Sequence, residues 1–197
     1  LDSNDEDTEK EYKCDGIRSL VGGFLVEMVL GNQNTWGNIS LYCSSYFGGK
    51  YPSPLALFLP IFLFLKTVFL PVSGMIVQHI SIKTLIARLL RDMLGADAGQ
   101  FHLADEKNPE SSFYFFVISY AALFGIATGL SYILPLRICY EHYPGRRGLV
   151  SGIVIGGFGF GTFVFTFVST ALINPDNLPL IDGIAPPEVA QNVPEAL

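Results

Sequence analysis

The chain has 197 residues, of which 50% are hydrophobic and 15% are charged, and its mean hydropathy is +0.40. Charged residues make up about a quarter of an average water-soluble domain, so this composition argues against most soluble enzymes. The formal net charge is −6, with acidic residues gathered toward both ends of the chain, which does not suit nucleic-acid binding.

The N-terminal residues 1–16 form an acidic arm with almost no apolar side chains, and we expect this arm to be disordered. A first membrane span is expected near residues 19–46. It is apolar up to Leu30 apart from Glu27, and then becomes half-polar. Because unsatisfied polar groups are costly in lipid, this half should face protein or a wet cavity.

The second expected span, near residues 55–77, contains Pro60, Pro71 and one charge, Lys66. Proline kinks a membrane helix and frees a carbonyl group that a neighbouring helix can satisfy, so we expect a bundle of several helices. Residues 82–94 alternate apolar and basic side chains at helical spacing, which predicts an amphipathic helix on the membrane surface.

A polar loop is expected at residues 95–112, followed by a membrane hairpin with spans near 113–138 and 149–173. Each span meets the roughly 20 apolar residues that a helix needs to cross a hydrocarbon core about 30 Å thick. Residues 174–197 read as an acidic, Pro-rich loop or tail. The predicted fold is therefore an all-α integral membrane protein with about four transmembrane helices plus an amphipathic surface helix.

Glycines recur at four-residue spacing in both helices of the hairpin, in small-xxx-small patterns that let helix backbones approach closely. We expect tight helix packing at these positions; the alternative is a glycine-rich sliding surface in a moving transporter. The glycines are Gly125, Gly129, Gly152, Gly156, Gly157, Gly159 and Gly161.

Polar residues within the spans are the candidate substrate-pathway residues. Glu27 is an intramembrane acid, which by default suggests proton coupling or cation pairing, although a neutral, hydrogen-bonded acid is the alternative. Arg137 either attracts a substrate anion or extends to the lipid headgroups. Lys66 either extends to the lipid headgroups or pairs with Glu27. The full candidate set is Glu27, Asn32, Trp36, Asn38, Tyr42, Tyr132 and Arg137.

The first-helix candidates recur at three- to four-residue spacing, which predicts one shared helix face lining a cavity, or hydrogen bonds between helices. The three cysteines have no paired spacing, and no catalytic triad, phosphate loop or zinc spacing occurs. We therefore expect no enzyme activity, no cofactor and no metal. The chain opens on Leu1 without a recognisable targeting leader, as a processed product or fragment would.

Two motifs resemble the major facilitator superfamily, and within it the oxalate/formate antiporter-like branch, which is related to monocarboxylate porters. One is Gly148-Leu149-Val150-Ser151-Gly152, after Arg146-Arg147 and before the glycines of 156–161; it is similar to the region between the fourth and fifth helices. The other, Thr35-Trp36-Gly37-Asn38-Ile39-Ser40, is similar to the first helix. Residues 187–194 resemble the loop before the sixth helix.

The resemblance implies the N-terminal half of a major-facilitator bundle that moves mono- or dicarboxylates by alternating access. Its implied partners are the lipid bilayer and a small carboxylate, in the plasma membrane or an organelle membrane such as the mitochondrial inner membrane. The alternative function is a transporter-derived structural subunit that no longer transports and binds other membrane subunits.

Two departures from the family pattern support that alternative. In the gating loop after the second helix, Gly74 is followed by Gln78, Ser81 and Lys83, so the acid and the second glycine of the pattern are missing; Arg146 and Arg147 complete this candidate gate. The third helix also has no counterpart. A further crossing would place the N-terminal arm, the amphipathic helix of residues 82–94 and the turn at Arg146 and Arg147 on one side of the membrane, as the positive-inside rule favours. With only four crossings, this turn faces the other side.

Overall fold

The computed structural model describes residues 3–46, 54–76, 81, 84–89, 91, 109–181 and 183–193. Within these residues the chain is helical and has no strand, only an isolated bridge between Ile181 and Ile184. The elements are α1 (Ser3–Leu30), η1 (Gly31–Thr35), α2 (Trp36–Tyr46), α3 (Pro54–Ile76), α5 (Pro109–Ser131), α6 (Leu134–His142), η2 (Pro144–Arg146), α7 (Arg147–Ile173) and α8 (Pro187–Ala190). The all-α fold class is confirmed.

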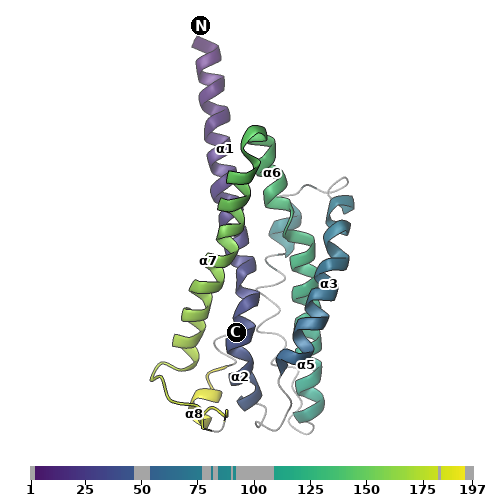
Figure 1. Ribbon diagram of the computed structural model, residues 1–197, viewed down its shortest axis with the longest axis vertical. Coiled ribbons are helices and arrows are strands. Elements are labelled where there is room, and N and C mark those ends of the chain that lie inside the picture. The colour runs from purple at the N-terminus through teal and green to yellow at the C-terminus, as the bar shows by residue number, and fades with distance from the viewer. Residues whose placement is uncertain are drawn as a thin grey trace.

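Three stretches of the described chain are long and apolar enough to cross a membrane: Ala56–Ile76, Tyr114–His142 and Pro144–Ile173. We expected about four. The difference lies in the first expected span, because the amides that follow Leu30 lower its hydropathy and the α-helix gives way there to the 3₁₀ turn η1. The protein is an all-α membrane protein, with α1, η1 and α2 running along its other helices (Figure 1).

The helices pack as two pairs, α1 and η1 against α7, and α3 against α5 (Figure 1). Glycines close both contacts. A Cβ atom on Gly125 or Gly129 would lie 2.9 Å or 2.7 Å from a backbone carbonyl oxygen of α3, and one on Gly157 or Gly161 would overlap a carbonyl oxygen of α1. Only glycine allows these approaches. At three other glycines an added Cβ atom meets nothing within the described residues, so these glycines take no part in the two contacts: Gly152, Gly156 and Gly159.

The acidic arm is helical, which corrects the expectation of disorder. α1 begins at Ser3 and extends beyond the rest of the bundle at the purple end of the chain (Figure 1). In the sequence, Glu6 precedes Lys10 and Glu9 precedes Lys13 by four residues, a spacing that stabilises a helix. This local charge pattern explains a helix without an apolar face.

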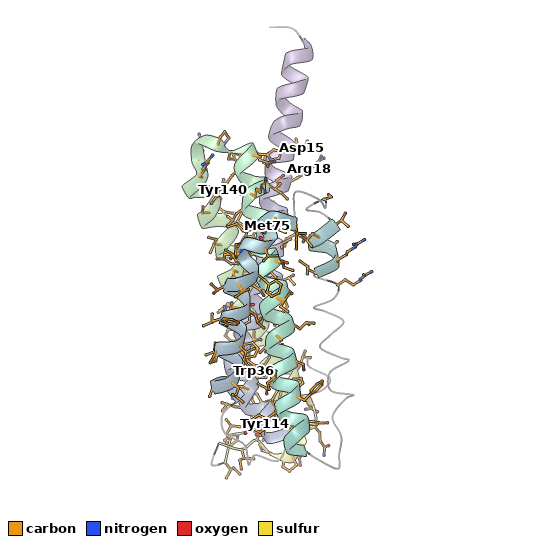
Figure 2. The ribbon with its side chains drawn as sticks, turned by 90° about the vertical axis from the view of Figure 1, so that its right-hand side faces the viewer. Asp15, Arg18, Trp36, Met75, Tyr114 and Tyr140 are labelled. Atoms are coloured by element: carbon orange, nitrogen blue, oxygen red, sulfur yellow. The ribbon has the colours of Figure 1, made fainter. Side chains whose placement is uncertain are left out.

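Three segments that carry basic residues, at Arg18, Arg88 and Arg147, lie at one end of the bundle. Asp15, Arg18, Met75 and Tyr140 are near the end where α1 begins, whereas Trp36 and Tyr114 lie toward the other end (Figure 2). The helical segment 84–89 lines a pocket together with Asp15 and Arg18. Since Met75 is near the end of α3 and Tyr114 near the start of α5, these two helix termini lie at opposite ends of the bundle (Figure 2). The turn at Arg146 and Arg147 therefore lies at the same end as the helical segment 84–89 and not at the opposite end. This arrangement agrees with the positive-inside rule.

The segment boundaries differ from the expected ones in two places. Of the amphipathic helix expected at 82–94, residues 84–89 and 91 are helical and the others lie outside the described residues. The loop expected at 95–112 lies outside them up to residue 108, but α5 already begins at Pro109. Proline is favoured in the first turn of a helix, where its missing N–H is not needed, and this accounts for the earlier start.

The C-terminal stretch packs on the bundle instead of extending from it. Val189 and Val193 are buried in the same core as Trp36. The backbone N–H of Ala185 donates to the Ser45 hydroxyl at 2.8 Å. The described part of this stretch therefore covers the end of α2, with α8 as its one-turn helix (Figure 1).

Candidate functional site

Lys66 carries the charge of α3 and lies near the middle of that helix, in a ring of aromatic side chains. Its Nζ atom is 4.6 Å from the ring centroid of Tyr132, 5.3 Å from that of Phe158 and 5.7 Å from that of Phe62. These rings come from the turn between α5 and α6, from α7 and from α3. Cation–π attraction of this kind holds an ammonium group away from water.

Glu27 reaches the same region from α1. It is fully buried, and neither carboxyl oxygen has a hydrogen-bond partner among the described residues. The Glu27 carboxyl group interacts electrostatically with the Lys66 ammonium group and with the Tyr132 hydroxyl group. An ionisable pair inside a membrane bundle is costly to keep, so such groups usually lie on substrate or proton paths.

A buried hydrogen bond crosses the bundle beside this pair. The Thr128 hydroxyl of α5 donates to Gln33 Oε1 of η1 at 2.6 Å, and both side chains are buried. Ser131, one turn further along α5, is also buried, and its hydroxyl has no partner in the described part of the chain. Polar groups from both helix pairs therefore meet at the middle of the bundle, where secondary transporters commonly bind their substrates.

The predicted candidates divide between this centre and other places. Glu27 and Tyr132 lie in it. Asn32 accepts a hydrogen bond from the Thr35 hydroxyl through its carbonyl oxygen at 2.6 Å, within η1. Trp36 and Tyr42 are buried in the apolar core, where the indole stacks on the ring of Phe58 with the centroids 4.6 Å apart.

Asn38 lies on the side of α2 away from Trp36. Its amide donates to the Thr170 hydroxyl of α7 at 2.7 Å, whereas Trp36 faces α3 and α5 through Phe58 and Tyr120. Two residues apart on a helix point in nearly opposite directions, so the expected single cavity-lining face is wrong for this pair. For Asn38 the structure shows the alternative, a hydrogen bond between helices.

Arg137 is exposed and lies apart from the central pair. It lines a surface pocket of about 490 Å³ with Tyr140, Glu141 and Arg147, at the basic end of the bundle. Of the candidate gating residues, Arg146 and Arg147 are exposed, Gly74 faces open space, and Lys83 lies outside the described residues.

The sequence interpretation missed three residues of the centre: Gln33, Thr128 and Ser131. It considered Lys66 only for extension to the headgroups or for pairing with Glu27. The signal for Lys66 was present, since a lone charge within an apolar span is rare. Amides and hydroxyls give no such signal, because they are common on helices that pack together. In the ranges that the structure covers, no group of three His, Cys, Asp or Glu side chains is placed to hold a metal.

Comparison with known proteins points to transporters. The chain is 27% identical over 206 aligned residues to the apicoplast pyruvate carrier 1 of Toxoplasma gondii, an alignment covering 88% of the chain and 38% of that protein. It is 39% identical over 56 residues to an uncharacterised MFS-type transporter, YhjX, of Escherichia coli strain K12, covering 28% of the chain and 14% of that protein. The chain thus spans less than half the length of these curated relatives.

No family model matches the chain, and no solved structure does. The relatives and the apolar helices together support a membrane protein with a role in transport in general.

Proposed function

We propose that these helices form part of a secondary transporter for small carboxylate anions, in which Lys66 binds the carboxylate. The observation that carries the proposal is the position of the Lys66 ammonium, in the middle of the bundle among rings from three elements and beside the unpartnered Glu27. The helices would supply one half of an alternating-access bundle.

The chemistry of the centre supports an anion. A carboxylate of the substrate takes the place of the Glu27 carboxylate beside Lys66 and gains a charge-assisted hydrogen bond. Glu27 has no hydrogen bonds within the described chain to lose, and it takes up a proton when the substrate displaces it, because an unpaired buried carboxylate is costly. The aromatic rings accommodate a short carbon body and exclude water, which strengthens the attraction between charges.

The relative from Toxoplasma gondii is named for pyruvate, a monocarboxylate. Within the mono- and dicarboxylates that the sequence resemblance implies, this favours a small monocarboxylate as the substrate. We also propose that the transporter exchanges one anion for another, as oxalate/formate antiporters do. Both anions would bind the same cationic site.

The test is uptake of radiolabelled pyruvate by proteoliposomes containing the protein expressed in full. Lys66→Met should reduce uptake at least tenfold, because a single hydrogen bond to a charged group contributes about 1.5–3 kcal/mol. Lys66→Arg keeps the charge and should retain part of the activity. Thr67→Val is the matched control, since the Thr67 hydroxyl is exposed and donates within its own helix to the Leu63 carbonyl oxygen.

Equal uptake by Lys66→Met and the unmodified protein contradicts the role of Lys66. Uptake no greater than that of protein-free vesicles, together with partner proteins that copurify in fixed ratio in mild detergent, supports the alternative of a structural subunit instead.

A further inference from the structure

A cleft of about 240 Å³ lies between η1, the start of α2, and α3, next to the central Lys66. Figure 2 shows its one labelled residue, Trp36, among side chains packed between the helices. One wall is apolar and mostly aromatic, and the other carries amide and indole groups. The lining residues are Gln33, Asn34, Trp36, Gly37, Phe58, Leu59 and Phe62.

Two of the lining residues each have a buried N–H donor without an acceptor in the described chain: Gln33, at Nε2, and Trp36, at Nε1. Both side chains are 2% exposed. In this structure the Thr128 hydroxyl donates to Gln33 Oε1 at 2.6 Å, and Nε2 is left without a partner among the described residues. An indole N–H can only donate. Because buried donors in folded proteins nearly always find acceptors, two unpaired donors beside one cleft indicate a missing acceptor.

We infer that this cleft is a binding site for a small monocarboxylate, whose oxygens accept hydrogen bonds from Gln33 Nε2 and Trp36 Nε1. A carboxylate presents two acceptor oxygens at once, and the rings of Phe58 and Phe62 suit its short carbon body. The choice of a carboxylate as the acceptor rests on the proposed function. The two donors and the cleft do not depend on it.

The cleft adjoins the Lys66 centre through a shared side chain. The ring of Phe62 lines the cleft, and its centroid is 5.7 Å from Lys66 Nζ. An anion at Gln33 and Trp36 therefore occupies a second position on a path that leads to Lys66. Both donor nitrogens are closed to solvent in this structure, so the surrounding side chains move apart when the anion enters.

Trp36 is the single tryptophan among these 197 residues, so the fluorescence of this chain reports on the cleft. The experiment titrates the 197-residue chain in lipid nanodiscs with sodium lactate, chosen because pyruvate absorbs in the near ultraviolet. Lactate should change the Trp36 emission with saturation. Its neutral ester, methyl lactate, should not.

Variants locate the bound anion. Gln33→Leu should weaken lactate binding about tenfold or more, since it removes a donor to a charged acceptor. Thr67→Val is the control: it removes an exposed hydroxyl of α3 that lies outside the cleft and donates to the Leu63 carbonyl oxygen, and it should change the affinity less than twofold. Trp36→Phe, measured by calorimetry, should weaken binding to a similar degree as Gln33→Leu and covers the case in which Gln33→Leu does not fold.

A response that does not saturate, or unchanged affinity in folded Gln33→Leu and Trp36→Phe, overturns the inference and means that the cleft holds only water. Lys66→Met separates the two proposals. It should lose pyruvate uptake and keep a saturable lactate response. Normal uptake in Lys66→Met with an intact lactate response removes the proposed role of Lys66 and leaves the cleft standing.

Discussion

The two helix pairs are held together by different chemistry. Where η1 and α2 meet α7, polar side chains cross the contact: Asn34 donates to Thr162, Thr162 donates to the Gly31 carbonyl oxygen at 3.0 Å, and Asn38 donates to Thr170. In the α3–α5 pair, the close backbone contacts at Gly125 and Gly129 are joined by ring contacts such as that of Phe58 with Tyr120.

Lipid explains why either solution works. Apolar helix faces gain little by leaving a hydrocarbon environment, so association depends on close backbone contact, on hydrogen bonds and on ring packing. Hydrogen bonds fix the register of η1 and α2 on α7, because each joins two particular atoms. Ring contacts in the α3–α5 pair depend on shape instead. The groups that bridge the pairs, such as Gln33 with Thr128 and Lys66 with Phe158, lie where the candidate site is.

The largest expected effect breaks the feature that both pairs share. Gly161→Leu should destabilise the protein by about 3 kcal/mol, since its side chain would have to displace the Met28 carbonyl oxygen of α1. Equilibrium unfolding in mixed micelles, followed by circular dichroism, measures this change. Gly156→Leu in the same helix is the control: a Cβ atom there meets nothing, and its effect should stay within about 0.5 kcal/mol. Equal losses in both variants would falsify the assignment of the contact face.

The second prediction concerns the ring contacts of α3. Phe58→Leu removes ring contacts with Trp36 at 4.6 Å and with Phe62 at 5.5 Å, and should cost about 1–2 kcal/mol. The same unfolding assay measures it, and the Trp36 emission should also change. Phe64→Leu is the control on the same helix, because Phe64 is 67% exposed. If the two substitutions cost the same, ring packing does not hold α3 in place.

Local sequence properties were enough to predict the long helices and their membrane character. Length and hydropathy are sums over neighbouring residues, so the stretches that include Leu70, Val117 and Val164 were recognisable without tertiary information. The arm before Asp15 was missed because its helix depends on charge spacing and not on apolar residues.

The site was predictable only in part, because it depends on which helix faces meet. Gly157 and Gly161 are four residues apart and share the face that contacts α1, whereas Gly159 points elsewhere, although all three look alike in the sequence. Glu27 was recognisable as an intramembrane acid. Its pairing with Lys66 was one of two alternatives from the sequence, and only the packing of the helix pairs selects it.

The smallest expected effect tests whether the contact of α2 with α7 is held by hydrogen bonds. Thr170→Val removes the acceptor of the Asn38 amide and should cost about 0.6 kcal/mol, the average for a hydrogen bond between membrane helices, because the unfolded helix also finds partners in the membrane. A double-mutant cycle with Asn38→Leu, analysed in the unfolding assay, should give a coupling energy of the same size. Thr67→Val serves as the control, since that hydroxyl donates within α3, and its combination with Asn38→Leu should be additive. A coupling energy of zero between Asn38 and Thr170 would mean that both pairs are held by packing alone, and the contrast between them would disappear.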